Sequence, residues 1–435
     1  MPLDIITVIV LLVAAILLVQ AGTSLIQTLY IWDSPERIRA AGAPDTYAKP
    51  KHGFTVLLPA RHEQEVIGET VRKLGEAKYP KELLELMVIC SEDDTETIAA
   101  AEHAKREYGL ENVTVLVFGG SPGKAKAMNL GLEAAKHELL TIFDSEDDVS
   151  PELFSIVDTL YQRKRIDVLQ GGVQLMDYDS HWFSAHNVLE YFFWFKSRMH
   201  YFAKSGAVPL GGNTVFFRAT DLQEVGGWDE STLTEDGDLG VRLSIAGKRF
   251  GVMYDSDHVT KEEVPHSTKA FIKQRTRWNQ GFLQMIRKGD WLRLPTLRKR
   301  LLIGSVLTAP TFMALVIASA PLFIIVGITV KLPVLVSLLT AVPLLMAVLM
   351  LCTSILGLYE FGKDQGLHVR WWQYLYLVVT FVPYQGILMI SAVRAAYREL
   401  LGQRGWEKTA HSGAHRGAPQ PASPALVPAM ASEAA

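Results

Sequence analysis

The chain has 435 residues, which is enough for one large domain with additional elements. Its 43 Lys and Arg residues nearly balance its 46 Asp and Glu residues, so the overall charge favours no nucleic-acid partner. Cys90 and Cys352 lie in separate apolar runs, which excludes a disulfide framework and a cysteine-rich metal site. Hydrophobic residues make up 49 % of the chain, and many of them are concentrated in a few long stretches.

Four stretches of the chain contain no charged residue, and each is longer than the roughly 20 apolar residues that cross a bilayer. The first is not expected to be a cleavable signal peptide, because no positive charge precedes it and no small-residue cleavage site follows it. We therefore expect a multi-pass protein of the cell membrane, with the lipid bilayer as one partner. The stretches lie between Asp4 and Asp33, between Arg300 and Lys331, between Lys331 and Glu360, and between Arg370 and Arg394.

Basic residues on both sides of the middle region predict that this region faces the cytoplasm. Arg37 and Arg39 follow the first apolar stretch, and six cations lie between residues 287 and 300. Residues 286–300 are expected to form an amphipathic segment in the membrane interface, although an ordinary basic surface helix explains them equally well. The predicted domains are a membrane helix over 1–32, a cytoplasmic domain over 50–285, this interfacial segment, membrane helices over 301–394 and a disordered tail over 409–435.

The three apolar stretches after residue 300 leave the topology open. If all three cross the bilayer, the tail lies outside, yet its basic residues favour the inside. One stretch is therefore expected to be interfacial or re-entrant, and Leu301–Val330 is the first choice because it contains Pro310 and Pro321.

Strand-like and helical patterns alternate through the middle region, which is typical of a parallel sheet with crossover helices. The expected strands are Phe54–Ala60, Leu86–Cys90, Val113–Phe118, Leu139–Phe143, Val168–Val173 and Thr214–Arg218. The expected helices are Glu63–Ala77, Thr95–Tyr108, Ala125–Lys136, Pro151–Arg163 and Asp238–Ala246. A further helix, Asn187–Ala203, is crowded with aromatic residues and is assigned to the core in preference to a sugar-stacking surface.

Acidic residues follow the strand Leu139–Phe143, at the end of a sheet where ligands of α/β proteins bind. Asp144 and Glu146 are one residue apart, so their carboxylates can hold one hard cation and leave positions for phosphate oxygens. A solvated acidic turn would be the interpretation of this stretch taken alone. Its neighbours in the sheet favour the metal site, because Gly119–Lys126 is a glycine-rich turn that offers N–H groups and two lysines to a phosphate.

Two further motifs lie closer to the membrane stretches. Thr234-Glu235-Asp236 begins a helix, where its two acids suit a general base aimed into a cleft, although Thr234 can also serve as a helix cap. Gln274-Arg275-Thr276-Arg277-Trp278 adds a cation and an aromatic ring beside the membrane. A cation–π surface is the simpler interpretation of that second motif.

In this order, the motifs resemble those of the processive, membrane-embedded family 2 glycosyltransferases, which include cellulose, chitin, hyaluronan, poly-N-acetylglucosamine and curdlan synthases. The resemblance covers about Phe54 to Met285 and the flanking membrane stretches. It implies an α/β domain of the GT-A type, which binds a nucleotide sugar on a mainly parallel sheet and is flanked by transmembrane helices.

The resemblance also implies roles for individual residues. Glu146 stands where the commoner motif has Asp, so Asp147 is an alternative metal ligand, and which of Glu92, Asp93 and Asp94 meets uracil stays open. The implied groups are Asp144 and Glu146 for Mg²⁺ or Mn²⁺; Ala60, Glu63, Glu92, Asp93, Lys126, Asp144 and Ser145 for the donor; Asp236, with Glu235, for catalysis; and Gln274, Arg277, Trp278 and Gly212 for pyrophosphate and acceptor.

The implied activity is that of an inverting hexosyltransferase. It would transfer glucose or N-acetylglucosamine from a UDP-sugar to a growing β-linked polysaccharide. The synthesis would be coupled to export of the product, with accessory export proteins as possible partners. The alternative in the same family is a single transfer to a lipid or polyprenyl phosphate. A nucleotide-binding transporter or scaffold without activity and a hydrolase with paired carboxylates are weaker alternatives, because the base and the phosphate-binding turn are both present.

Overall fold

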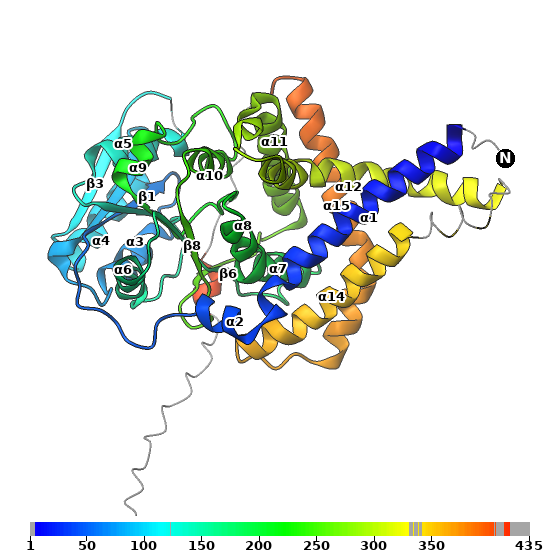
Figure 1. Ribbon diagram of the computed structural model, residues 1–435. Helices are drawn as coiled ribbons and strands as arrows, with labels where there is room; N and C mark the ends of the chain where they lie inside the picture. Colours follow the sequence, from blue (N-terminus) through cyan, green and yellow to red (C-terminus); the bar gives the residue numbers. More distant parts are fainter. Residues whose placement is uncertain are drawn as a thin grey trace, which may run out of the picture.

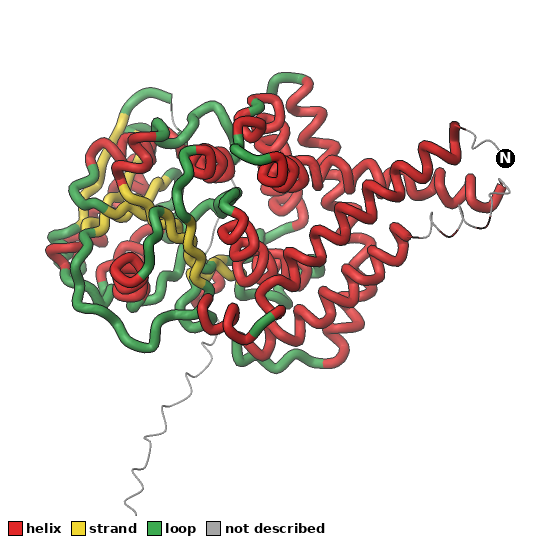
Figure 2. Tube along the Cα trace, in the orientation of Figure 1, coloured by secondary structure: helices red, strands yellow, loops and turns green. Residues whose placement is uncertain are grey.

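The computed structural model describes residues 5–121, 123–329, 334, 338, 342–403, 405 and 413–417. An α/β domain forms one end of the molecule, and long helices extend from its other side (Figures 1 and 2). The helices that extend furthest are α1 (Ile5–Leu29), α12 (Leu297–Thr329), α14 (Val342–Asp364) and α15 (Trp371–Leu400).

Within the described residues, seven strands form one sheet in the order β3-β2-β1-β4-β7-β5-β8. β7 runs antiparallel to its neighbours β4 and β5, and the other neighbours are parallel, which confirms the expected mainly parallel α/β fold. The strands are β1 (Phe54–Ala60), β2 (Leu84–Ser91), β3 (Val113–Phe118), β4 (Leu139–Ile142), β5 (Val168–Gly171), β7 (Val215–Arg218) and β8 (Phe250–Met253).

Helices cover both faces of this sheet because side chains alternate along each strand. Val56 and Leu58 of β1 belong to one apolar core, and Leu57 belongs to the other. The first core includes α3 (Ile67–Gly75), α4 (Thr95–Glu107) and α6 (Leu153–Arg163). The second includes α5 (Lys124–Ala134), α9 (Ala219–Glu224) and α10 (Glu235–Ile245).

The prediction of one strand over Val168–Val173 is wrong in one respect, because these residues belong to two separate strands. β5 ends at Gly171, and β6 (Val173–Leu175) pairs with β9 (Thr260–Glu262) in a separate two-stranded sheet. Gly172, between β5 and β6, packs closely against Tyr254 and Val259, since a Cβ at this position would lie 2.9 Å from side-chain atoms of both. The sequence patterns predicted neither β8 nor β9.

The aromatic segment forms three pieces, α7 (Ser184–Phe193), a π-helical turn (Trp194–Arg198) and α8 (Met199–Ser205). Phe192, Phe195 and Phe202 are buried, as the core interpretation predicted. Tyr191 and Trp194 line the cavity described below, so part of this segment also faces the site.

Three helical stretches are long and apolar enough to cross a membrane, judged by length and composition within the described residues. They are Leu11–Asp33, Leu297–Ala318 and Trp371–Leu400, which supports the expectation of a membrane protein. α12 contacts α15, and α14 contacts α1 and α15, so these helices form a bundle (Figure 1). α12 continues through Pro310 and Pro321, so these prolines do not divide it.

Residues 286–300 do not form the single helix that was expected there. α11 (Thr268–Lys288) ends at Gly289, whose φ of +79° favours glycine, and a 3₁₀ turn, η4 (Asp290–Arg293), follows. Trp291 then packs against the start of α12, where a Cβ at Gly304 would lie 3.0 Å from its ring.

The expected disordered tail, 409–435, lies outside the described residues except for 413–417. There, a 3₁₀ helix (Ala414–Gly417) packs on the α/β domain, so the prediction is wrong for this piece. The Arg416 guanidinium donates to the Val66 carbonyl at 3.2 Å, to the Thr70 hydroxyl at 2.5 Å and to the Asp147 carbonyl at 3.2 Å. Surrounding acidic residues, Asp148 and Glu69 among them, attract this charge.

Candidate active site

A cavity of about 1970 Å³ begins at the carboxyl ends of β1 and β4 and continues between α1, α12, α14 and α15. It brings together most of the side chains that the motifs predicted, although they are spread over more than 200 residues of sequence. The predicted residues that line it are Ala60, Glu63, Lys126, Asp144, Ser145, Glu146, Gly212, Glu235, Asp236, Gln274, Arg277 and Trp278.

The acidic turn after β4 separates its carboxylates by function. Asp144 and Glu146 line the cavity. Asp147 is fully buried, and its Oδ2 accepts hydrogen bonds of 2.8 Å from the Asp144 backbone N–H and from the Asn213 side-chain amide. Asp147 therefore holds the turn through Oδ2, and Asp144 and Glu146 are the carboxylates of this turn that line the cavity.

The residues fit a divalent cation of the Mg²⁺ or Mn²⁺ kind, since carboxylate oxygens are the ligands such ions prefer. Glu262, at the end of β9, lines the same cavity as Asp144 and Glu146. Among the described residues, no three His, Cys, Asp or Glu side chains form a ready-made cluster. A cation bound to Asp144 and Glu146 would therefore complete its coordination with waters and the phosphates of a donor, as Mg²⁺ usually does.

Of the two lysines in the glycine-rich turn, Lys124 lies beside Asp144, whereas the family resemblance had assigned the donor contact to Lys126. The Lys124 ammonium lies 2.7 Å from Asp144 Oδ1, whereas Lys126 donates to the carbonyls of Gly119 and Ser121 at 3.0 and 3.3 Å. Burial disfavours the charge of Lys124, but the carboxylates of Asp144, Asp236 and Glu235 outweigh it and raise the pKa of the ammonium. Lys124 thus stays protonated beside the position expected for a diphosphate.

The expected base, Asp236, lies in the first turn of α10, a helix that begins at Glu235, three residues before its predicted start at Asp238. Burial and the neighbouring charge of Glu235 raise the pKa of the Asp236 carboxyl well above its usual range, while Lys124 and Arg277 act in the opposite direction. A Cβ at Gly212 would lie 3.5 Å from Asp236 Oδ2, so the acceptor-side turn passes directly beside the base.

Asn213 connects this acceptor-side turn to the acidic turn, and the sequence had given no reason to select its side chain. Its amide donates to Asp147 Oδ2 at 2.8 Å and to Glu262 Oε1 at 2.5 Å. Thr214, with a φ of +53°, then enters β7 and donates to Thr260 Oγ1 at 2.7 Å. Because each partner comes from a different element, one amide fixes the relative positions of β4, β7 and β9.

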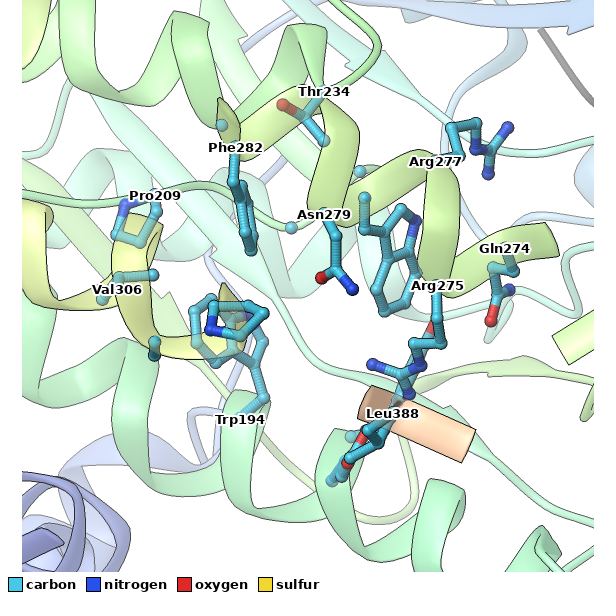
Figure 3. Close-up of a pocket in the computed structure, with 18 of the residues that line it drawn as sticks. Trp194, Pro209, Thr234, Gln274, Arg275, Arg277, Asn279, Phe282, Val306 and Leu388 are labelled. Carbon is cyan, nitrogen blue, oxygen red and sulfur yellow. Dashed lines mark ion pairs between the residues drawn. The ribbon is translucent and has the colours of Figure 1, made fainter. Parts of the chain in front are cut away.

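α11 carries Gln274, Arg277 and Trp278 into the cavity, as Figure 3 shows for Gln274 and Arg277. The Trp278 ring has two close partners. The Arg275 guanidinium is 4.4 Å from its centroid, and the Tyr191 ring is 6.3 Å away. Arg275 is itself held by Glu190 at 2.5 Å and Asn187 at 2.5 Å, so it acts as a support for Trp278.

The acids after β2 differ from the others, since Glu92 and Asp93 are exposed and do not line the cavity. Asp94 is buried, and its carboxylate accepts from the backbone N–H of Thr97 at 3.3 Å and of His62 at 2.5 Å, as a helix cap. Asp94 is therefore a structural residue. Ala60 and Glu63 line the cavity, and a uridine contact from Glu92 or Asp93 stays a prediction.

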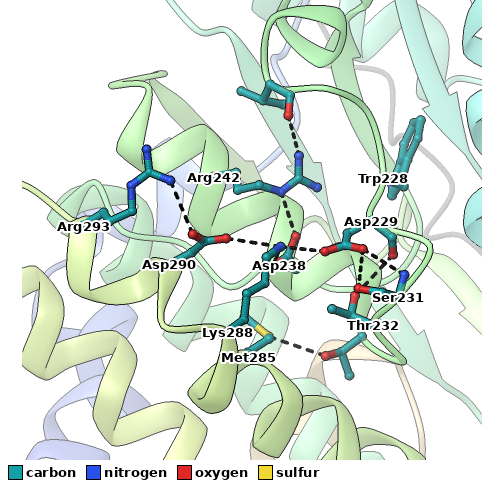
Figure 4. Close-up of polar contacts among 12 residues, drawn as sticks. Trp228, Asp229, Ser231, Thr232, Asp238, Arg242, Met285, Lys288, Asp290 and Arg293 are labelled. Atoms are coloured by element: carbon teal, nitrogen blue, oxygen red, sulfur yellow. Dashed lines mark hydrogen bonds and ion pairs between the residues drawn. The ribbon is translucent and has the colours of Figure 1, made fainter. Parts of the chain in front are cut away.

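A network of ion pairs behind the site holds α10 against α11 (Figure 4). The Lys288 ammonium lies 2.7 Å from both Asp238 and Asp229, and Arg242 Nε lies 2.7 Å from Asp238. Because Asp238 follows Asp236 by two residues on α10, this network fixes the helix that carries Asp236.

Comparison with known proteins identifies the family of this chain. The profile described as "Glycosyltransferase like family 2" matches residues 50–281, which is more than half of the chain. The chain belongs to this family. By family it is a family 2 glycosyltransferase, and its fold is GT-A-like.

Curated relatives of this glycosyltransferase differ in the acceptors that their names state. A β-monoglucosyldiacylglycerol synthase of Trichormus variabilis is 26 % identical over 55 % of this chain and 52 % of the relative. A poly-β-1,6-N-acetyl-D-glucosamine synthase of Staphylococcus epidermidis is 23 % identical over 58 % of this chain and 60 % of the relative. The chain spans about half the length of the first of these relatives.

A solved structure resembles the fold over nearly the whole chain. The mannosyltransferase PcManGT of Pyrobaculum calidifontis, in complex with GDP-Man and Mn²⁺, is 19 % identical and covers 90 % of this chain and 99 % of its own, with a TM-score of 0.59. At this identity the similarity shows the fold, including the GT-A-like α/β domain.

Proposed function

We propose that this glycosyltransferase transfers glucose or N-acetylglucosamine from a UDP-sugar to a hydroxyl group of a membrane lipid, with inversion at the anomeric carbon. The observation that carries this proposal is the continuous cavity, which extends from Asp144 and Asp236 to α1, α12, α14 and α15. A donor bound at the sheet and an acceptor held by the helices can therefore meet beside Asp236.

The chemistry requires one proton acceptor and several positive charges. Asp236 accepts the proton of the acceptor hydroxyl. At the same time, the hydroxyl oxygen of the acceptor bonds to the anomeric carbon of the sugar, and the bond between that carbon and the diphosphate breaks. The negative charge on the departing diphosphate is stabilised by Lys124 and Arg277. A bound Mg²⁺ or Mn²⁺ on Asp144 and Glu146 would add Lewis-acid stabilisation of the same charge. The complex of PcManGT with GDP-Man and Mn²⁺ supports this cofactor.

A lipid acceptor suits the membrane side of the cavity because aliphatic side chains predominate there. Sugars are commonly held by aromatic faces and hydrogen bonds, whereas acyl chains need only apolar surface. Polar groups come from Gln20, Ser24 and Thr28 of α1, with Arg198 donating to the Ser24 hydroxyl at 2.8 Å. The aliphatic lining includes Val13, Leu17, Val306, Ala309, Met313, Ala347, Val382 and Leu388. The name of the glucosyldiacylglycerol synthase states an acceptor of this class.

A second candidate is the processive extension of a β-linked polysaccharide, coupled to export through the helices. It is favoured by the Gln274–Trp278 motif and by the Tyr191 and Trp278 rings at the centre of the cavity. The poly-N-acetylglucosamine synthase among the relatives is named for such a product. In both cases the basic flanks of the middle region support a cytoplasmic active site in a multi-pass membrane protein.

The test uses the purified full chain in vesicles, supplied with UDP-glucose, UDP-N-acetylglucosamine or GDP-mannose and either diacylglycerol or an oligosaccharide. A product with one sugar on the lipid supports the first proposal, and a long polymer without a lipid supports the second. UDP release with neither product would contradict both.

The Asp236→Asn variant should lose transfer by roughly 10²–10⁴-fold, the usual contribution of a general base, while still binding the donor. Transfer at the wild-type rate would show that Asp236 is not the base.

A further inference from the structure

A second hollow of about 440 Å³ shares no lining residue with the cavity that contains Asp144 and Asp236. It is formed where the 3₁₀ turn Tyr30–Asp33, which follows α1, and α2 (Pro35–Ala41) meet α8 and the start of α12. Four cations and two tyrosines dominate its walls, and none of the described residues that line it is acidic. They are Arg37, Lys204, Arg298, Lys299, Tyr30 and Tyr201.

The positive charge of this hollow is largely uncompensated. Arg37 pairs with Asp33 at 2.8 Å and stacks on Tyr30, with 4.2 Å between its guanidinium carbon and the ring centroid. Among the described residues, Lys204, Arg298 and Lys299 form no ion pair. Side chains of one charge sign around a small hollow favour a ligand of the opposite charge.

The backbone adds to this field, because the hollow lies at the N-terminus of a long helix. Thr296 also lines it, and its hydroxyl accepts from the Lys299 backbone N–H at 3.3 Å, in the first turn of α12. Although the Lys299 N–H is capped in this way, the dipole of the helix favours an anion at this end. Here the helix end acts together with the cationic side chains.

The hollow also lies at the level where two candidate membrane spans reach the α/β domain. The span Leu11–Asp33 ends beside it, and the span Leu297–Ala318 begins beside it. Tyr30 and Tyr201, in edge-to-face contact with 5.5 Å between centroids, form a wall of the kind that is common at membrane–water interfaces. If these two spans cross a bilayer, lipid headgroups lie at the level of the hollow.

We infer that this hollow binds the phosphate of an anionic phospholipid headgroup, with Lys204, Arg298 and Lys299 as its direct partners. Its acyl chains would lie along α1 and α12, outside the catalytic cavity. The inference does not rest on the proposed acceptor, since none of these three cations lines the catalytic cavity. It assigns the protein a preference for membranes that contain anionic lipid.

The experiment measures binding of phosphatidylglycerol to the detergent-purified full chain, by thermal unfolding and by native mass spectrometry. Phosphatidylglycerol should raise Tm and remain bound, whereas phosphatidylcholine should do neither. The Lys204→Gln, Lys299→Gln double variant should bind phosphatidylglycerol about 30-fold more weakly, since each juxtamembrane cation contributes about 1 kcal/mol. Lys363→Gln removes one exposed lysine at the end of α14, outside the hollow, and should leave binding unchanged.

Several results would overturn the inference. They are equal binding of phosphatidylcholine, equal weakening by Lys363→Gln, or unchanged binding in the double variant. If inorganic phosphate at the same concentration raised Tm as much as phosphatidylglycerol does, the hollow would instead be a site for a soluble anion. If the double variant does not fold, Arg298→Gln serves in its place, because it changes one exposed side chain. This variant should bind phosphatidylglycerol several-fold more weakly. Unchanged binding would again contradict the inference.

Discussion

Lys124 and Asp144 form an ion pair, with 2.7 Å between the ammonium nitrogen and the carboxylate oxygen. This pair joins the glycine-rich turn after β3 to the acidic turn after β4, on strands that are not neighbours in the sheet. It places a permanent positive charge next to the proposed cation site. A departing diphosphate would meet both.

Replacing Lys124 tests this arrangement. Lys124→Met should lower kcat by roughly 10²-fold or more, because it removes a preorganised charge from the leaving group. Lys126→Met is the matched control, and its effect should be much smaller, since its ammonium donates to backbone carbonyls. Rates of UDP release at saturating donor measure both variants, and a larger loss in Lys126→Met would restore the assignment that the sequence motif suggested.

The pH dependence follows from the environment of Asp236. Burial and Glu235 raise the pKa of its carboxyl, and only the deprotonated form can accept a proton. Activity should therefore fall as the pH drops, and the fall should begin at a pH above the ordinary pKa of an Asp carboxyl. Glu235→Gln removes a charge that raises this pKa, so the acid limb of kcat/KM should move to lower pH.

The control for the pH profile is Glu133→Gln, which removes an exposed carboxylate of α5. Its acid limb should coincide with that of the wild type. A Glu235→Gln limb that stays in place, or moves to higher pH, would mean that another group limits the reaction.

Gly281 tests how α11 supports the base. A Cβ at Gly281 would lie 2.4 Å from Thr234 side-chain atoms, and Gln284 of the same helix accepts from the Leu233 N–H at 2.9 Å. Gly281→Ala should destabilise the protein by about 1–3 kcal/mol through overpacking and should lower kcat by shifting the start of α10. Gly22→Ala, in α1 where nothing lies within 4 Å of the new Cβ, should change neither Tm nor kcat.

Metal removal tests the role of Asp144 and Glu146. A chelator should abolish transfer, and Mg²⁺ or Mn²⁺ should restore it, because these two carboxylates need donor phosphates and waters to complete a coordination sphere. Glu146→Gln should raise the metal concentration needed for half-maximal activity. Full activity in excess chelator would show that Lys124 and Arg277 suffice without a cation.

The parts of the fold that the sequence predicted are those governed by local pattern. The apolar runs of β1, β3 and β4 alternate with amphipathic helices, so the α/β class and most site motifs could be identified. Contacts between distant segments could not. Nothing near Asn213 in the sequence indicates that its amide joins Asp147 to Glu262, because both partners come from other elements.

The two lysines of the glycine-rich turn illustrate the same limit. Lys124 and Lys126 have the same chemistry and almost the same position in sequence. Only the direction of the first turn of α5 turns Lys124 toward Asp144 and Lys126 back toward Gly119. Likewise, hydropathy predicted the membrane helices, but not that they continue the cavity of the catalytic domain.

The shared cavity has a practical consequence for inhibition. A compound that links a uridine head to a single alkyl tail could occupy the sheet end and the helix end at once. Binding of one part would raise the local concentration of the other, so the linked compound should exceed either fragment in potency by a wide margin. Enzymes whose nucleotide pocket is closed off from the bilayer would gain nothing from such a tail, which would make the compound selective.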